Sequence, residues 1–563
     1  MNYRNKTRIF CFFAVMLVTA FNACKKYENP AQVFEEYGDG KDGNAVRKVL
    51  VINVNGAVGA DIKSISPTNI AALVKTGKFS FNEIKDGIPS DAGSLASMLT
   101  GVSSSKHKIV DNTYIPINDS NDGHDQIINY PSMFSRMLDV RPEFKTVTIT
   151  SDAALDKYLI HADRSILAES DASVKDSAVN ALKGSIAKVI MVDFRSVKAA
   201  GSMYGFSPDI PEYKTAIETI DRYIGEMMTA LKARKDYASE DWLIIVTTNR
   251  GGDDNNSKPG FIICSNPSLK EQGISKEGFN TMHFKGTSTN AYIKNDNALY
   301  DSGADKDFTV QLQIKMNLSN SYPGFFSKSN GVIGSSTTGW TMFQEGITYG
   351  VIFGGTNNGG SGKTQVLGST ITDGKWHTIT MTVKLSGLIR TATLYTDGNQ
   401  VGTLNITATK SLSTTEPLTL GHKNVDGSSN LDFYAADMLY FNAALTSESI
   451  KNNIALKDIT KHPNYSNLIG YWSIDEGGGG VLINSVPAGP NFLMRGSGIW
   501  DALGNDIPAS RTPQALTDGT LSIVATGPDV TALTFYWLKV PVKSDWSLDG
   551  VPWISNFEIE YIK

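Results

Sequence analysis

The spacing of hydrophobic residues changes once along this chain of 563 residues, and that change limits the folds it can adopt. Up to about residue 265, short and almost wholly apolar runs alternate with stretches of helical periodicity. Such runs suit strands that are buried on both faces of a parallel sheet. From about residue 298 to 444, apolar and polar residues alternate between turns rich in Gly, Asn, Asp and Ser. The sequence therefore predicts an α/β region followed by an antiparallel β-sandwich.

Local signals place individual elements in both regions. The clearest helix follows Pro211, a residue favoured at the first position of a helix, and its apolar side chains recur at helical spacing as far as Leu231. In the second region, Asp397-Gly398 between two alternating runs indicates a hairpin. The apolar runs that we expect to form strands of the first region are residues 49–54, 146–150, 188–194, 242–248 and 260–264.

Composition excludes several classes of protein. Apolar residues make up 41% of the chain, which is too many for a disordered protein. The formal net charge is −5 and no long basic run occurs, so we expect no nucleic-acid partner. Only three Cys are present, which excludes a disulfide framework and a Cys-rich zinc site. Cys264 lies in an apolar run and is expected in the core.

The N-terminus predicts export and a lipid anchor. Basic residues at positions 4, 6 and 8 precede an apolar run from Ile9 to Phe21, which is too short to span a bilayer. This arrangement is typical of a signal peptide, here residues 1–23. The junction at Cys24 resembles a bacterial lipobox, and the resemblance implies cleavage before Cys24, a lipid on its sulfur and a polar tether over residues 24–45. The alternative is a plain signal peptide with an incidental Cys.

Six stretches of the first region resemble, in order, the alkaline-phosphatase superfamily, especially its phosphodiesterase and nucleotide-pyrophosphatase branch. The resemblance implies a degenerate α/β domain of this type over residues 46–285. It also implies that relatives hold two metal ions, usually zinc, beside a Thr or Ser nucleophile at the carboxyl ends of the strands. The matching stretches are VLVINVNG (49–56), SPTNIAALVKTGKFSF (66–81), SLASMLTGVSSSKHKI (94–109), KAAGSMYGF (198–206), the helix at 212–234 and DWLIIVTTNRGG (241–252).

At every position that can be matched to that site, the residue has changed. Asp91 stands where the family has its nucleophile, and the other matched positions normally carry metal-binding Asp or His. Lys198 and Arg250 therefore place cations where zinc would need carboxylate or imidazole ligands. We predict a pseudoenzyme without a metal cofactor, in which Asp91 pairs with Lys198, Arg250 or both. The residues of this vestigial site are Asn55, Asp91, Lys198, Ser202, Asn249 and Arg250.

The alternative is a metal-dependent phosphoesterase or sulfatase-like hydrolase with displaced active-site residues. Ser90 and Ser94 lie near Asp91 in the sequence and could supply a shifted nucleophile. Against this, few imidazole ligands are available. Histidines in polar surroundings, which we expect at the surface, are His107, His124 and His161.

The second region resembles the LamG or concanavalin-like jelly roll. The resemblance implies an all-β sandwich over residues 297–457, with a rim that binds calcium in some members. Three Asp could supply oxygen ligands, although turn chemistry explains them equally well: Asp373, Asp397 and Asp432. The fragments that carry the resemblance are DFTVQLQIKM (307–316), GFFSK (324–328), DGKWHTITMTV (373–383), LYTDG (394–398) and LTLGH (418–422).

Residues 465–563 resemble an uncharacterised small β-rich domain that follows LamG-like modules in surface lipoproteins of Bacteroidetes. We expect a connector from Phe284 to Asp296, because this segment lacks apolar periodicity. Trp376 is expected in the core of the sandwich rather than as a sugar platform, and Trp340 is left open. C-terminal aromatic residues that we expect in a core, rather than in an exposed patch for a partner, are Tyr536, Trp537, Trp546, Trp553 and Phe557.

These resemblances together imply a non-catalytic lipoprotein of the outer membrane, anchored through lipid on Cys24 and exposed at the cell surface. Its α/β domain would be a pseudoenzyme scaffold that carries binding modules. The expected role is accessory to a SusC/SusD-type nutrient uptake complex, with a glycan or a peptide as the ligand. A working hydrolase with displaced residues is the alternative.

Overall fold

The computed structural model describes most of the chain after the N-terminal segment. The predicted signal peptide, Cys24, the tether and His124 lie outside the described residues. Within the described ranges, no helix is long and apolar enough to cross a membrane. These ranges are 46–85, 87–88, 90–117, 128–254, 257–276, 278–287, 289–330, 338–355, 364–424, 430–496, 498–512, 516 and 519–561.

A mostly parallel sheet is the centre of the first region. Its strands are β1 (Val46–Val54), β2 (Gly77–Glu83), β3 (Thr146–Thr150), β4 (Arg164–Leu167), β5 (Val189–Phe194), β6 (Glu240–Thr247), β9 (Gly260–Ser265), β10 (Gln272–Ser275) and β27 (Leu521–Ser522). Among the described residues the sheet has nine strands in the order β27-β10-β2-β9-β6-β1-β5-β3-β4, and only the two pairings of β9 are antiparallel. Strands β3 and β5 are buried throughout, as expected for strands covered on both faces. The predicted strands are confirmed.

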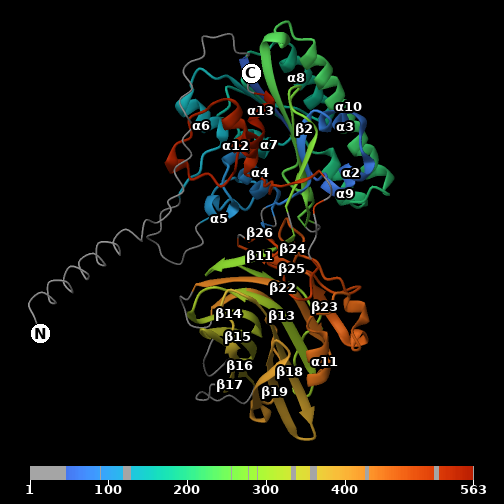
Figure 1. Ribbon diagram of the computed structural model, residues 1–563, viewed down its shortest axis with the longest axis vertical. Coiled ribbons are helices and arrows are strands. Elements are labelled where there is room, and N and C mark those ends of the chain that lie inside the picture. Colours follow the sequence, from blue (N-terminus) through green and yellow to red (C-terminus); the bar gives the residue numbers. More distant parts are fainter. Residues whose placement is uncertain are drawn as a thin grey trace, which may run out of the picture. The chain divides into compact units, whose positions relative to one another are not determined.

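Helices cover both faces of this sheet (Figure 1). They are α2 (Gly59–Ile65), α3 (Thr68–Val74), α4 (Asp91–Thr100), α5 (Ser104–His107), α6 (Met133–Val140), α7 (Ala153–Tyr158), α8 (Asp171–Gly184), α9 (Ser196–Tyr204), α10 (Pro211–Lys232) and α12 (Asp529–Trp537). Helix α10 packs against α3, α8 and α9, whereas α4 packs against α5 and α12. The helix predicted after Pro211 is α10, with that proline at its start.

The second region is a sandwich of two antiparallel sheets, each with eight strands in the described part of the chain. One contains β11 (Phe279–Gly286), β13 (Phe308–Met316), β18 (Trp376–Ser386), β19 (Ile389–Thr396), β20 (Asn399–Asn405), β22 (Leu431–Phe441), β23 (Leu468–Trp472) and β26 (Ile499–Gly504). The other contains β12 (Asn290–Tyr292), β14 (Asn320–Ser329), β15 (Gly339–Gly346), β16 (Thr348–Gly354), β17 (Thr364–Thr370), β21 (Leu418–Asn424), β24 (Val481–Leu482) and β25 (Phe492–Arg495). Residues of both sheets share one hydrophobic core, as the jelly-roll prediction requires.

The predicted hairpin is the turn between β19 and β20. Asp397 and Gly398 have positive φ angles of 51° and 76°, which a two-residue hairpin turn needs at both positions. Asp397 adopts this conformation while its carboxylate accepts the backbone N–H of Thr378 at 2.8 Å. The local sequence therefore predicted this turn correctly.

The segment from Phe284 to Asp296, expected to be a connector, belongs to the sandwich instead. Strand β11 pairs with β22 and β26, and β12 pairs with β21 and β25. Phe284, Ala291 and Ile293 are buried in the core. The segment lacks a simple apolar period because its two short strands enter different sheets. The connector interpretation is therefore wrong, and the other domain boundaries stay predictions.

The C-terminal region divides between the sandwich and the α/β sheet. Strands β23, β24, β25 and β26 join the sandwich, so this part is β-rich as expected. The chain then returns to the first region, where β27 pairs in parallel with β10 and α12 packs on α4 and β1. Trp537, Trp553 and Phe557 are buried, which confirms the core interpretation for these residues.

Burial corrects two other expectations about single residues, those for Trp376 and His107, and decides the open case of Trp340. Trp340 is fully buried, whereas Trp376 is half-buried at the edge of the core, so the prediction for Trp376 is only partly right. His107 is buried rather than exposed, because its ring contacts Ser97 Oγ at 2.8 Å and accepts the N–H of Ile109 at 2.9 Å. His161 is exposed and Cys264 is buried, as expected.

Candidate functional site

Helix α4 places Asp91 at the carboxyl ends of the central strands. Ser90 caps the helix by accepting the N–H of Gly93 on its hydroxyl at 3.2 Å. The helix ends at Thr100 and is followed by Gly101, whose φ of 71° is the left-handed conformation typical of a helix C-cap. Asp91 is thus the first residue of a buried helix, where the helix dipole favours a negative charge.

The carboxylate of Asp91 is contacted by four side chains from three parts of the chain. Its Oδ2 accepts from Asn55 Nδ2 at 2.9 Å and from an Arg195 guanidinium nitrogen at 2.7 Å. Lys198 Nζ lies 3.1 Å from the same oxygen. Its Oδ1 accepts from Asn249 Nδ2 at 2.6 Å. Both carboxylate oxygens are therefore already engaged by the protein, and the predicted pairing of Asp91 with Lys198 is present.

The electrostatic environment keeps Asp91 ionised. Burial alone would raise the pKa of its carboxyl group. The charges of Lys198 and Arg195 and the hydrogen bond from Asn55 outweigh burial and hold the pKa well below its usual range. Asp91 is consequently a charged acceptor and not a general acid at physiological pH.

A second set of polar contacts links the strand ends beneath Asp91. Asn53 on β1 donates to Asp193 at 2.6 Å and to Asn249 at 3.1 Å. Asn53 also accepts the backbone N–H of Asn249 at 2.7 Å, and Thr150 donates to Asp193 at 2.9 Å. Burial raises the pKa of Asp193, against the lowering effect of Arg195. These contacts join the ends of β1, β3, β5 and β6.

Arg250 is close to this network but contacts other groups. Its buried guanidinium donates to the carbonyl oxygens of Ser90, at 2.8 Å, and Ile88, and to Ser94 Oγ at 3.1 Å. It also forms an ion pair with Asp254. Arg250 therefore supports the first turn of α4. Of the two partners predicted for Asp91, Lys198 forms the ion pair, whereas the charge of Arg250 lowers the pKa of Asp91.

Ser202 is the sixth residue of the predicted site, and its contact differs from the others. Its hydroxyl donates to Asp253 Oδ2 at 2.8 Å. The structure thus brings Asn55, Lys198 and Asn249 onto Asp91 and gives Ser202 a separate acidic partner. The vestigial character of the six residues stays a prediction.

Three residues of this network were not predicted from the sequence: Asn53, Asp193 and Arg195. Each lies at or just beyond the end of a predicted apolar strand, and Arg195 bridges Asp91 to Asp152, which is 3.1 Å away. The signal was present, since polar residues at adjacent strand ends meet in a parallel sheet. These three residues lie outside the positions that carry the nucleophile or the metal ligands in relatives, and the resemblance therefore did not point to them.

A cavity of about 270 Å³ opens over Asp91. Two cations and three carboxylates face it, so its lining is strongly polar. Its lining residues are Ser90, Asp91, Val110, Asp111, Asn112, Arg195, Lys198 and Asp254.

The residues at this cavity do not fit a pair of zinc ions. Zinc sites use Cys, His, Asp or Glu donors, and Asp91 is the one matched position that offers such a group. Its oxygens already accept four bonds, two of them from cations. In the part of the chain that the structure describes, no group of three or more His, Cys, Asp or Glu is arranged to hold a metal.

The Asp residues considered for calcium are engaged with histidines of the sandwich. His377 lies between Asp373, at 2.9 Å, and Asp397, at 2.8 Å. Asp432 contacts a different histidine, His283, at 2.6 Å. The structure therefore gives these carboxylates protein partners rather than a common site.

Comparison with known families supports the three-part organisation. Residues 49–324 match the family described as Type I phosphodiesterase / nucleotide pyrophosphatase. Residues 285–451 match the Concanavalin A-like lectin/glucanases superfamily. Residues 458–554 match a domain of unknown function, DUF4983. The resemblances predicted for the three regions are thereby confirmed.

Solved structures resemble part of the chain at low identity. A 2-O GAG sulfatase matches with 11% identity and a TM-score of 0.32, covering 40% of this chain and 65% of its own. Murine ectonucleotide pyrophosphatase/phosphodiesterase 5 matches with 16% identity and a TM-score of 0.28, covering 36% of this chain and 57% of its own. The chain thus spans less than two thirds of either protein. No curated protein matches it.

Proposed function

We propose that this chain is a non-catalytic protein whose alkaline-phosphatase-like region serves as a scaffold for binding modules. The observation that carries the proposal is the occupation of Asp91. Where relatives have a nucleophile beside metal ions, this chain has a carboxylate that accepts bonds from Asn55, Asn249, Arg195 and Lys198. Any metal bound there would have to displace two cations from their carboxylate partner.

The nearby hydroxyl groups give little support to a displaced active site. A serine nucleophile needs an adjacent base or a metal ion to remove its proton. Ser90 Oγ is the cap of α4, and Ser94 Oγ donates to the carbonyl of Ser90 while it accepts from Arg250. Neither hydroxyl has an imidazole partner in these contacts. A hydrolase with displaced residues is therefore the outcome that the experiment below must exclude.

We further propose that the protein is a lipoprotein of the outer membrane, exposed at the cell surface and accessory to a SusC/SusD-type uptake complex. The support for the anchor is the sequence around Cys24, which resembles a lipobox. The support for the accessory role is the resemblance of the C-terminal region to surface lipoproteins of Bacteroidetes. A sandwich of the concanavalin-like type is a suitable module for binding a nutrient.

The test uses the full chain, purified in mild detergent, with metal analysis and turnover assays. We expect no stoichiometric zinc, and no hydrolysis of aryl phosphates, phosphodiesters or sulfate esters above that of Asp91→Ala. Asp111→Ala is the matched control, because Asp111 lines the same cavity but is exposed and bonds to Thr113. Two tightly bound metal ions per chain, or turnover abolished by Asp91→Ala and retained in Asp111→Ala, would overturn the proposal. Proteins that co-purify identify a transporter partner.

A further inference from the structure

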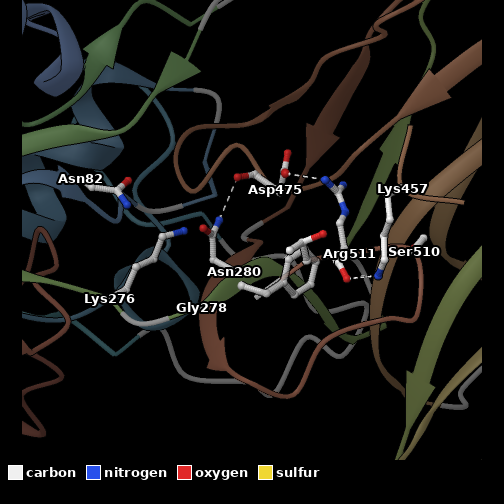
Figure 2. Close-up of a pocket in the computed structure, with 10 residues that line it drawn as sticks. Asn82, Lys276, Gly278, Asn280, Lys457, Asp475, Ser510 and Arg511 are labelled. Atoms are coloured by element: carbon white, nitrogen blue, oxygen red, sulfur yellow. Dashed lines mark hydrogen bonds and ion pairs between the residues drawn. The ribbon is translucent and has the colours of Figure 1, made fainter. Parts of the chain in front are cut away.

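A second and larger cavity, of about 440 Å³, lies at the meeting point of β2, the connection from β10 to β11, and C-terminal loops (Figure 2). It shares no residue with the cavity over Asp91. Its volume falls in the range of sites that hold small molecules. Its lining includes Asn82, Lys276, Phe279, Asn280, Arg511 and Thr512.

Two of the three cations in this cavity have structural partners. Arg511 forms ion pairs with Asp437 at 2.7 Å and with Asp475 at 2.9 Å, and donates to the carbonyl of Ser473 at 2.9 Å. Lys457 donates to the carbonyl oxygens of Ala509 and Arg511. These contacts hold the C-terminal loop, compensate the charge of Arg511 with two carboxylates, and use two of the three N–H groups of Lys457 on carbonyl oxygens.

Lys276 differs from the other two cations. Among the described residues it makes no hydrogen bond or ion pair, and Figure 2 shows its ammonium group pointing toward the amide of Asn280. Burial lowers the pKa of Lys276 to about 8, against a raising effect of Asp475. An ammonium group that is partly buried without a direct partner is stabilised by an anion placed beside it.

The remaining walls offer hydrogen bonds to a polar ligand. Asn280 uses its amide N–H on the carbonyl of Asp475 at 3.0 Å, which leaves its amide oxygen available to the cavity. In the described part of the chain, the side chains of Asn82 and Thr512 make no hydrogen bond to protein. Phe279 supplies one aromatic wall, with the Arg511 guanidinium 5.6 Å from its ring centre. Amides, a hydroxyl and one ring suit a ligand rich in hydroxyl groups.

We propose that this cavity binds a sugar acid, with the anionic group of the ligand at Lys276 and its hydroxyl groups at Asn82, Asn280 and Thr512. The anionic group is a carboxylate or a sulfate, both of which accept charge-assisted bonds from an ammonium group. Because the residues differ from those around Asp91, this site stands whether or not the first cavity has lost catalysis.

The test measures binding to the full chain in mild detergent by calorimetry, with D-glucuronate, a galactose sulfate, neutral glucose and inorganic sulfate. We expect at least one sugar acid to bind about tenfold or more tightly than glucose or inorganic sulfate. Lys276→Gln should lose about that factor, whereas Lys276→Arg should keep most of the affinity. Whichever of D-glucuronate and the galactose sulfate binds more tightly shows whether the preferred anionic group is a carboxylate or a sulfate.

Lys384→Gln is the matched control, because Lys384 is an exposed lysine of β18 away from the cavity. The affinity of this variant for the sugar acids should equal that of the wild type. Thermal melting of each variant shows whether it is folded. No saturable binding of either sugar acid, or equal affinity in the wild type and folded Lys276→Gln, would overturn the proposal. Inorganic sulfate that binds as tightly as the sugar acids would overturn the hydroxyl contacts. None of these results bears on metal content or turnover at Asp91.

Discussion

At the scale of single residues, Asp91 is a buried anion that depends on its neighbours. It collects donors that follow β1, β5 and β6, together with Lys198 of α9. The side chain of Asp91 is 8% exposed, whereas those of Arg195 and Lys198 are 23% and 21% exposed. The carboxylate is thus less hydrated than its cations, and it depends on them for compensation.

We expect Asp91→Ala to lower the free energy of unfolding by about 3 kcal/mol, because the variant leaves Arg195 and Lys198 without their common partner. The folded-state pKa of Asp91 is depressed, so its contribution is present above the unfolded pKa of about 4 and is lost as the pH falls through the folded pKa. Denaturant unfolding should give a constant difference from wild type above about pH 5 and a smaller one in acid.

Asp111→Ala is the control, since Asp111 is exposed and bonds to Thr113 at 2.9 and 2.6 Å. Its effect should be about 0.5 kcal/mol or less. Equal losses in the two variants would contradict a buried ionic role for Asp91.

His283 of the sandwich has the opposite dependence on pH. Its ring contacts Asp432 at 2.6 Å and Asp501 at 3.3 Å, and stacks on Tyr434. Burial lowers the pKa of His283, but these two carboxylates outweigh it and raise the pKa overall. The stabilisation is therefore complete below the unfolded pKa of about 6.5 and is lost as the pH rises through the folded pKa.

We expect His283→Gln to destabilise the sandwich by about 2 kcal/mol near pH 6 and by less near pH 9, as measured by denaturant unfolding. Lys285, which also lies 3.3 Å from Asp432, is unchanged in this variant. His462→Gln is the control with the opposite pH dependence. Burial lowers the pKa of His462, so the stabilisation that His462 contributes is lost as the pH falls. A His283→Gln effect that grows toward alkaline pH would refute the assignment.

At the scale of elements, α12 is the helix of the C-terminal region that packs on α4 and β1 of the α/β region. Thr531 donates to the carbonyl of Met98 on α4 at 2.8 Å. Trp537 is fully buried, and its Nε1 donates to the carbonyl of Asp241 at 3.2 Å. The guanidinium of Arg47 lies 4.8 Å from the Trp537 ring centre. This helix therefore stabilises the first region although it follows the sandwich in sequence.

We expect Trp537→Ala to lower stability by about 4 kcal/mol, through the lost burial and the cavity left behind. Hydrogen exchange should increase in α4 and β1 while the sandwich strands keep their protection. Trp376→Ala is the matched control, since Trp376 is half-buried in the sandwich and contacts Phe279. The Trp376 variant should lose less stability, and its increase in hydrogen exchange should be confined to β11 and β18. Unchanged hydrogen exchange in α4 and β1 of the Trp537 variant would show that α12 does not stabilise the first region.

At the scale of the whole molecule, regions that are successive in sequence are not independent in space. β27 extends the first sheet after the chain has completed the sandwich, and β11 enters the sandwich directly after β10. We expect a truncated variant that ends before residue 520 to lose stability in the first region, since both β27 and α12 would be missing. The predicted attachment of the chain to the membrane depends instead on its N-terminus.

We expect Cys24→Ala to release the full chain from membranes, because the variant lacks the sulfur that would carry the lipid. Membrane fractionation measures the release, and mass spectrometry of the wild-type N-terminus measures the lipid. Cys264→Ala is the control, since Cys264 is buried in the α/β region and membrane retention should be unchanged. Continued retention of Cys24→Ala, with no lipid on the wild type, would exclude the anchor.

The sequence alone determined the order of the regions, the strands of the first sheet, α10 and the β19–β20 turn. These features follow from periodicity and turn chemistry, which act over a few residues. The resemblance to the alkaline-phosphatase superfamily also placed Asn55, Asp91, Lys198 and Asn249 at one site, since they match positions that meet there in relatives. Sequence patterns could not show which charged and polar side chains pair with one another in the folded chain.

Only the tertiary structure showed that Arg195 pairs with Asp91 from 104 positions away and that Arg250 binds the first turn of α4 instead. It alone showed α12 on the first sheet, the segment after Phe284 inside the sandwich, and Lys276 in a cavity with Asn82 and Asn280. The physical reason is that ion pairing and burial depend on distances across the folded chain. Hydrophobic periodicity records which face of an element is covered, but not which residue covers it.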